Sequence, residues 1–188
     1  GEQFSRPGPC TLLPTWNHLW FVAYLWIYTM ALGGLLLVVP QLLDGMERVL
    51  GKVLSGSLLL VLPSLVFGLY RLILQPIYPS THALFGDWYN HALFGTIFLI
   101  GFLLARADGF WVAVERQRWV ALSLAAVIFL TILGVRWWRL SGYAVPELLR
   151  IYAAMAYGTF QWLCMVAVLG FAKRWLTADS PARRYLTD

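Results

Sequence analysis

Long apolar stretches separated by short polar segments make up most of the chain. Five of them are predicted to be helices, at residues 17–39, 55–74, 88–105, 119–136 and 150–172. About 20 apolar residues at 1.5 Å each cross the hydrocarbon of a bilayer, so runs of roughly 18 or more indicate transmembrane spans. The pattern therefore predicts an all-α fold, a polytopic transmembrane helix bundle with about five spans.

Segment 41–54 follows a different pattern. Apolar residues recur at helical spacing on one face (Leu42, Met46, Val49, Leu50 and Val53), and charged residues occupy the other (Asp44, Glu47, Arg48 and Lys52). A basic amphipathic helix of this kind is typical of the membrane interface. A short soluble helix that caps the bundle fits nearly as well, and neither interpretation gives the segment any chemistry.

Small residues and one proline inside the spans bear on helix packing. Pro63 and Gly68 interrupt the second span, which a buried helix tolerates when a neighbour supplies a partner for the freed carbonyl. Gly101 with Ala105, and Ala154 with Gly158, are spaced for close helix contact. We expect Arg71, near the end of the second span, to extend its head group toward the interface.

Composition supports a membrane location. Apolar residues make up 60% of the 188 residues and charged residues only 12%, whereas a soluble domain is usually about a quarter charged. Most of the ten tryptophans fall near the ends of apolar runs, where indole rings favour the headgroup zone. Two cysteines do not make a disulfide framework. The lipid bilayer is therefore an expected partner, and the net charge of +5 indicates orientation rather than nucleic-acid binding.

The basic residues are distributed unevenly between alternate loops. One side, formed by 41–54, 106–118 and the tail from 173, carries nine (Arg48, Lys52, Arg106, Arg116, Arg118, Lys173, Arg174, Arg183 and Arg184). The opposite side carries four (Arg6, Arg136, Arg139 and Arg150). Basic loops stay on the cytoplasmic side. This predicts an inner (plasma) membrane protein with a cytoplasmic C-terminus and with loops 75–87 and 137–149 outside.

Candidate catalytic residues gather on the predicted outer side. His18 is the second residue of its span and His91 the fourth of the third span, which places the two imidazoles at similar depth. Asp87 precedes His91 by four residues and so shares its helix face. A carboxylate there could fix the imidazole tautomer, as a general base requires. Asp87 could equally cap the helix that starts beside it.

Further polar residues lie on the same side. They are His82, Asn90, Tyr143, Glu147 and Arg150. Glu147 and Arg150 are spaced for a local ion pair, and the Arg150 guanidinium could instead hold an anionic or carbonyl group. The chain contains no His-Glu-x-x-His, Gly-x-Ser-x-Gly or Cys-x-x-Cys motif, and no metal site is expected.

Three segments in order resemble the acyltransferase family 3 membrane enzymes. The first is HLWF at 18–21 followed by AYL at 23–25, and the second is DWYNH at 87–91 leading to FLIGFLLA at 98–105. The third runs from Arg150 through Trp162 and LGFA at 169–172 to RYL at 184–186. The similarity covers essentially the whole chain. It is closest to the branch that modifies periplasmic glucans and other surface glycans.

The resemblance implies transfer of an acyl group from a cytoplasmic thioester donor to an acceptor hydroxyl, often on a sugar, at the far face. Acyl-CoA or a similar thioester would be a co-substrate, and no bound cofactor is expected. The family's Arg and His signature is absent, so we expect residues 1–188 to be one transmembrane domain, part of a larger bundle, and inactive without its remaining helices. His18, His91 and Asp87 are then the catalytic candidates. Trp20, Asn90, Glu147 and Arg150 are the substrate-binding candidates.

Two other functions fit the same residues. The chain could be a haem-binding electron-transfer subunit, with His18 and His91 as axial ligands between two helices. It could also be a non-enzymatic transporter or scaffold subunit, although the sequence shows no internal repeat of the kind that transporters often carry.

Overall fold

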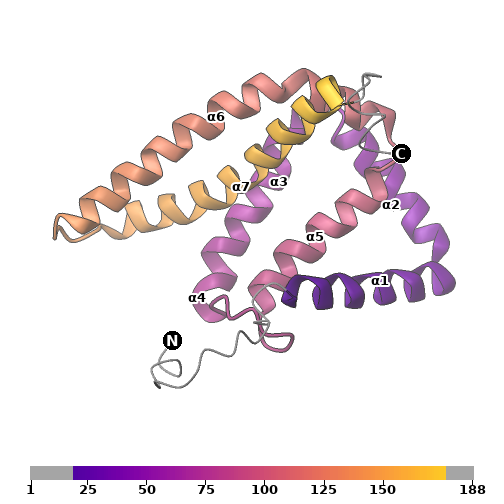
Figure 1. Ribbon diagram of the computed structural model, residues 1–188, viewed down its shortest axis with the longest axis horizontal. Helices are drawn as coiled ribbons and strands as arrows, with labels where there is room; N and C mark the ends of the chain where they lie inside the picture. The colour runs from indigo at the N-terminus through magenta and orange to yellow at the C-terminus, as the bar shows by residue number, and fades with distance from the viewer. Residues whose placement is uncertain (1–18, 177–188) are drawn as a thin grey trace, which may run out of the picture.

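A computed structural model of the chain describes residues 19–176, and within that range the regular structure is entirely helical (Figure 1). The all-α prediction is confirmed. The helices are α1 (Trp20–Val38), α2 (Pro40–Val53), α3 (Leu58–Leu69), the π-helix η2 (Tyr70–Leu74), α4 (Gln75–Ile77), α5 (Trp88–Leu104), α6 (Asp108–Leu140) and α7 (Glu147–Leu176).

Between residues 19 and 176, four helical segments are long and apolar enough to cross a membrane. They are Trp20–Val38, the continuous run Leu58–Ile77 formed by α3, η2 and α4, Asp108–Leu140 and Glu147–Trp175. The remaining predicted span is α5, whose 17 residues extend about 26 Å at 1.5 Å each, against roughly 30 Å of hydrocarbon. These helices are compatible with a multi-pass membrane protein.

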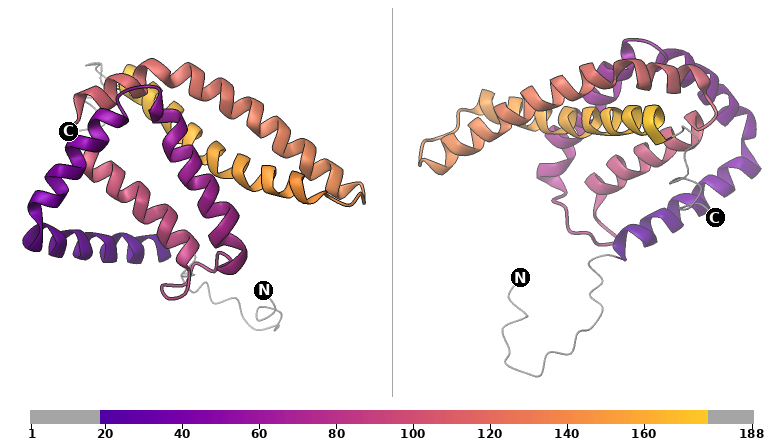
Figure 2. Two further views of the ribbon diagram at one scale, coloured as in Figure 1. Left: turned by 180° about the vertical axis from the view of Figure 1, so that it is seen from behind. Right: turned by 45° about the horizontal axis from the view of Figure 1, so that its top comes forward.

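The helices form two connected groups (Figures 1 and 2). Helices α6 and α7 make a long antiparallel hairpin that projects from the rest of the molecule, and α3 packs against α7. Helices α1, α2 and α5 form a triangle in which α1 crosses the start of α5. The chain turns sharply between α1 and α2 where Pro40 begins the second helix. The start of α5 is thereby brought beside the first turns of α1.

Helix α6 is longer than the predicted span at 119–136. The segment 106–118 was expected to be a loop, but α6 begins at Asp108 and has 33 residues. Phe110, Ala113 and Val114 are buried at helical spacing and pack in the core. The sequence pattern placed the start of the span at residue 119 because the exposed face of the preceding residues is charged. Their inner face is nevertheless apolar, and the helix includes them.

Pro63 is compensated by a neighbouring helix, as the sequence predicted. A proline cannot donate the backbone hydrogen bond to the carbonyl four residues earlier, which here belongs to Leu59. The indole Nε1–H of Trp162 in α7 donates to that carbonyl at 2.7 Å. Trp162 is buried and its ring lies edge-on to Phe67. This bond fixes the register between α3 and α7.

The two pairs of small residues behave differently. A Cβ at Gly158 would collide with the backbone of Phe67, so α3 and α7 approach each other closely here. Gly101 has no neighbouring atom within 4 Å of a Cβ built on it. Packing at Gly158 is confirmed, whereas Gly101 makes no close helix contact in this structure.

Helix α2 packs part of its apolar face on the protein, whereas Leu42 and Val49 of the same face are exposed. Leu43 is buried, and Met46, Leu50 and Val53 pack against the core. The charged residues of the opposite face are exposed. The packed residues fit a helix that caps the bundle, and the exposed Leu42 and Val49 fit contact with lipid, so the two interpretations of this helix stay open.

Candidate functional site

The candidate site residues form two separate groups in the structure. Asp87, Asn90, His91 and Trp20 gather where the start of α5 meets α1 and the 78–87 loop. Glu147 and Arg150 line a cavity between α3–η2–α4 and the tip of the α6–α7 hairpin. His18 lies outside the described residues.

Asp87 is a fully buried carboxylate that fastens the loop before α5. Its Oδ2 accepts hydrogen bonds from the backbone N–H groups of Thr81 (3.1 Å) and His82 (2.7 Å) and from the Asn90 side-chain amide (2.9 Å). The Tyr24 hydroxyl of α1 lies 3.2 Å from the same oxygen. Asp87 precedes the first residue of α5 but its side chain makes no capping bond to the helix. It therefore joins the loop, α1 and α5 rather than capping α5.

Asn90 completes this network from inside α5. Its side-chain amide donates to the Ser80 hydroxyl at 2.6 Å as well as to Asp87, and the residue is buried. The amide hydrogens are thus already committed to the protein. In this structure Asn90 holds the loop, and its predicted contact with substrate would require it to exchange these partners.

His91 has partners on both ring nitrogens. Nε2 lies 2.9 Å from the Leu84 carbonyl oxygen, and Nδ1 lies 3.0 Å from the Tyr28 hydroxyl. A carbonyl can only accept, so Nε2 carries the proton and Nδ1 accepts from Tyr28. The ring also stacks on Tyr24, with centroids 4.3 Å apart. The tautomer is therefore set by Leu84 and Tyr28, not by the carboxylate of Asp87 as the sequence suggested.

His82 is placed differently from His91. It is exposed and its backbone is left-handed (φ 57°), a conformation that histidine tolerates better than most residues. The bond from its N–H to Asp87 holds it there. Its imidazole lies 4.6 Å from the Trp20 ring, centroid to centroid. Residues of α1 and the loop, among them Trp20, Tyr24, Thr81 and His82, line a hollow of about 400 Å³.

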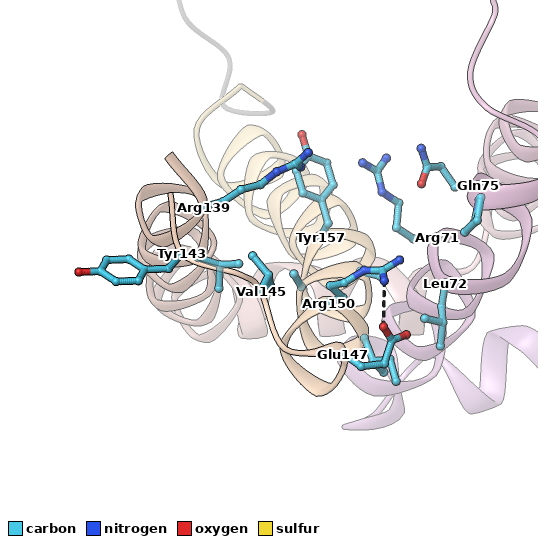
Figure 3. A pocket seen from close by; sticks show the side chains of 14 residues that line it. Arg71, Leu72, Gln75, Arg139, Tyr143, Val145, Glu147, Arg150 and Tyr157 are labelled. Carbon is cyan, nitrogen blue, oxygen red and sulfur yellow. Dashed lines mark hydrogen bonds and ion pairs between the residues drawn. The ribbon is translucent and has the colours of Figure 1, made fainter. Parts of the chain in front are cut away.

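A larger cavity, of about 840 Å³, opens at the tip of the α6–α7 hairpin (Figure 3). Its charged lining consists of Arg71, Arg139, Arg150 and Glu147. The predicted ion pair is present, with Arg150 Nη1 2.9 Å from Glu147 Oε2. Both side chains of the pair are largely exposed, so the pair contributes little to stability.

Arg71 is the half-buried charge of this cavity. The π-helix η2 presents it, and Figure 3 shows its side chain beside Gln75 and directed toward the space around Tyr157. Its guanidinium carbon lies 4.4 Å from the centre of the Tyr157 ring, and Nη1 donates to the Tyr89 hydroxyl at 3.2 Å. The head group lies in this cavity near the end of its span, and its extension toward the membrane interface stays a prediction.

Sequence reasoning missed several residues of both places. Tyr24 and Tyr28 were missed, although they follow the predicted Trp20 at intervals of four residues and share its face of α1, a signal that could have predicted an aromatic wall. Arg139 and Tyr157 lie on α6 and α7, far from Arg71 in the chain, so no local pattern connects them with it. Within residues 19–176 no group of three His, Cys, Asp or Glu side chains is placed to hold a metal ion.

Comparison of the chain with protein-family models, with curated proteins and with solved structures found no match. The function is therefore inferred from the residues themselves.

Proposed function

We propose that the protein is an integral membrane acyltransferase that moves an acyl group from a thioester donor to a hydroxyl of a glycan-like acceptor. Three sequence segments that resemble acyltransferase family 3 support the reaction class. The observation that carries the proposal is the hollow in which Asp87 holds His82 beside Trp20.

The hollow suits a hydroxyl-bearing acceptor. Trp20 supplies a flat apolar face with one polar N–H, and Thr81 and His82 supply groups that can hydrogen-bond to hydroxyls. The exposed loop makes the hollow reachable from water. A sugar ring, with apolar faces and a hydroxyl rim, matches this combination of surfaces.

His82 is the proposed general base. In the reaction the acceptor O–H gives its proton to the imidazole while its oxygen attacks the thioester carbonyl. The new C–O bond forms, the C–S bond breaks, and the proton passes to the departing thiolate. His91 is less suited to this step because both of its nitrogens are engaged. His18, two residues before Trp20, is the second candidate base.

Asp87 is a positioning residue in this proposal. It touches the backbone of His82 rather than the reacting atoms, and it keeps a strained residue in one conformation. A base held in place is ready for the transition state without reorganisation.

The donor is proposed to enter at the opposite end, where basic side chains gather. Arg118 lies over the Phe171 ring, and Arg174 lies 3.6 Å from Glu115. The excess of basic residues there favours a cytoplasmic location for this end and for the C-terminus, in the inner (plasma) membrane. A negatively charged thioester donor would meet complementary charge on that side.

The test is acyl transfer by membranes that contain the protein, or one of its variants at equal expression, together with the remaining helices that the resemblance to acyltransferase family 3 implies. We expect His82→Ala to lower kcat by about 100-fold or more, the typical contribution of a general base. Trp20→Ala is expected to raise KM for the acceptor. The control is Arg136→Gln, an exposed residue of α6 outside both places.

The possible outcomes distinguish an error in the identity of the general base from an error in the proposed reaction. Full activity in His82→Ala together with loss in His18→Ala would move the base to His18 and leave the acyltransferase intact. Absence of transfer by the unaltered protein would overturn the acyltransferase itself.

The haem alternative is less well supported by the geometry. An axial ligand needs a free nitrogen, and His91 would have to give up its bond to Tyr28 or to Leu84. We expect the purified protein to show no Soret absorbance after incubation with haem.

A further inference from the structure

We propose that the cavity lined by Arg71, Arg139 and Arg150 binds a phosphate group, carried either by a phospholipid headgroup or by a water-soluble phosphate. The proposal rests on the charges and shape of this cavity and is independent of acyl transfer.

The cavity has more positive than negative charge. Three guanidinium groups and one carboxylate line it, and that carboxylate, Glu147, is paired with Arg150. In the described part of the chain, neither Arg71 nor Arg139 has a carboxylate within ion-pair distance. An anion that enters the cavity would therefore meet two guanidinium groups that are not neutralised.

Arg71 gives the strongest indication that the cavity is an anion site. It is six residues before the end of the span Leu58–Ile77, which is about 9 Å along the helix. A charge inside a span is costly and usually faces a partner or a functional path. Within residues 19–176 Arg71 contacts the Tyr89 hydroxyl and the Tyr157 ring, and neither carries a compensating negative charge.

The local backbone also marks this position. Arg71 lies in the five-residue π-helix Tyr70–Leu74. A π-turn adds one residue to a helical turn and redirects the side chains around it, and such turns occur frequently at functional sites. Here the redirected side chain points into the cavity (Figure 3).

The arrangement of donors favours phosphate over carboxylate. Arg71, Arg139 and Arg150 come from η2, the end of α6 and the start of α7, so they surround the space rather than form one plane. One guanidinium is enough to pair with a planar carboxylate, whereas the oxygens of a tetrahedral phosphate can accept from several guanidinium groups. Arginine is also the side chain most used for phosphate recognition.

The rest of the lining accommodates more than a bare ion. The volume of about 840 Å³ is within the range of small-molecule sites. Leu72, Val135 and Ile151 supply apolar surface beside the charges. A phosphate attached to an organic group, such as the glycerol of a phospholipid, would fill both parts.

The experiment uses the full chain in dodecyl maltoside, a detergent that carries no phosphate. One arm adds sodium phosphate, with sodium chloride at matched ionic strength as reference, and records the melting temperature from tryptophan fluorescence. The other arm adds phosphatidylglycerol and counts retained lipid by native mass spectrometry. A response in the first arm identifies a soluble phosphate, and retention in the second identifies a headgroup. Either supports the proposal, and no response in both overturns it.

Amino-acid substitutions test whether phosphate binds in this cavity. Arg139→Gln is expected to weaken binding by roughly tenfold, or about 1.4 kcal/mol, because it removes a charge-assisted hydrogen bond to the phosphate. The matched control is Arg136→Gln, three residues earlier on α6, which lines a separate hollow with Trp137. Arg71→Gln should weaken binding further if the variant folds. If Arg136→Gln and Arg139→Gln weakened phosphate binding equally, phosphate would be attracted by surface charge in general, and the proposed site would be overturned.

Discussion

Replacement of Asp87 by alanine tests whether one carboxylate holds the 78–87 loop in place. The substitution removes the acceptor of four donors, but two of them keep another partner, since Tyr24 lies 2.7 Å from the Ala83 carbonyl and Asn90 donates to Ser80. The N–H groups of Thr81 and His82 lose the only acceptor they have within the described residues. The cost therefore concentrates on these two bonds.

Each of the two bonds goes to a charged group and contributes about 1.5–3 kcal/mol. Thr81 and His82 are exposed, so water can partly replace the carboxylate, and we expect the loop to lose about 2–4 kcal/mol. Since about 1.4 kcal/mol corresponds to a factor of ten, local opening should become roughly 30- to 1000-fold more frequent.

Hydrogen exchange of the backbone amides measures this opening directly. We expect faster exchange in residues 80–84 of Asp87→Ala and little change in the α6–α7 hairpin, which Asp87 does not contact. Asp87→Asn is the matched control, because its amide oxygen can still accept from the loop and most of the protection should remain. Unchanged exchange of the loop in Asp87→Ala would refute this reasoning.

Three further predictions concern packing and orientation. Gly158→Ala should destabilise the protein by about 1–3 kcal/mol or more, because the added methyl group meets the backbone of α3. Gly101→Ala has open space around the methyl group and should be neutral, and thermal unfolding compares the two variants. Trp162→Phe should cost about 1–3 kcal/mol in the same assay, since it leaves a buried carbonyl of α3 without its donor, and a cost near zero would contradict that role. Single cysteines in a cysteine-free background test the orientation in the membrane. Phe85→Cys should react with an impermeant thiol reagent from outside the cell, and Lys52→Cys only after permeabilisation. The reverse pattern would invert the predicted orientation.

The sequence predicted the helices well because their apolar runs are long. It failed at 106–118, where charged residues on one face hid an inner face made by Phe110, Ala113 and Val114. The compensation of Pro63 was expected, but the identity of its partner was not. Trp162 is about 100 residues away in the chain, so only the packing of α3 on α7 brings it to that carbonyl.

The sequence predicted which residues belong to the site better than it predicted what each of them does. Asp87 and Asn90 bond to each other, and Trp20 lies beside His82 of the adjoining loop, since the start of α5 and the start of α1 lie at the same end. The roles of His91 and His82 depended on contacts with loop carbonyls and N–H groups that leave no sequence pattern. The grouping of Arg71 with Arg139 depended on the tilt of the α6–α7 hairpin, which sequence spacing does not specify.

The acyltransferase proposal is tested most directly in inverted membrane vesicles that enclose a surface glycan. Radiolabelled acetyl-CoA is added to the cytoplasmic face, and label that becomes attached to the enclosed glycan and is released by mild alkali is counted. We predict alkali-labile label in vesicles that contain the protein and its loss in the His82→Ala variant. Label no higher than in vesicles without the protein would contradict the account.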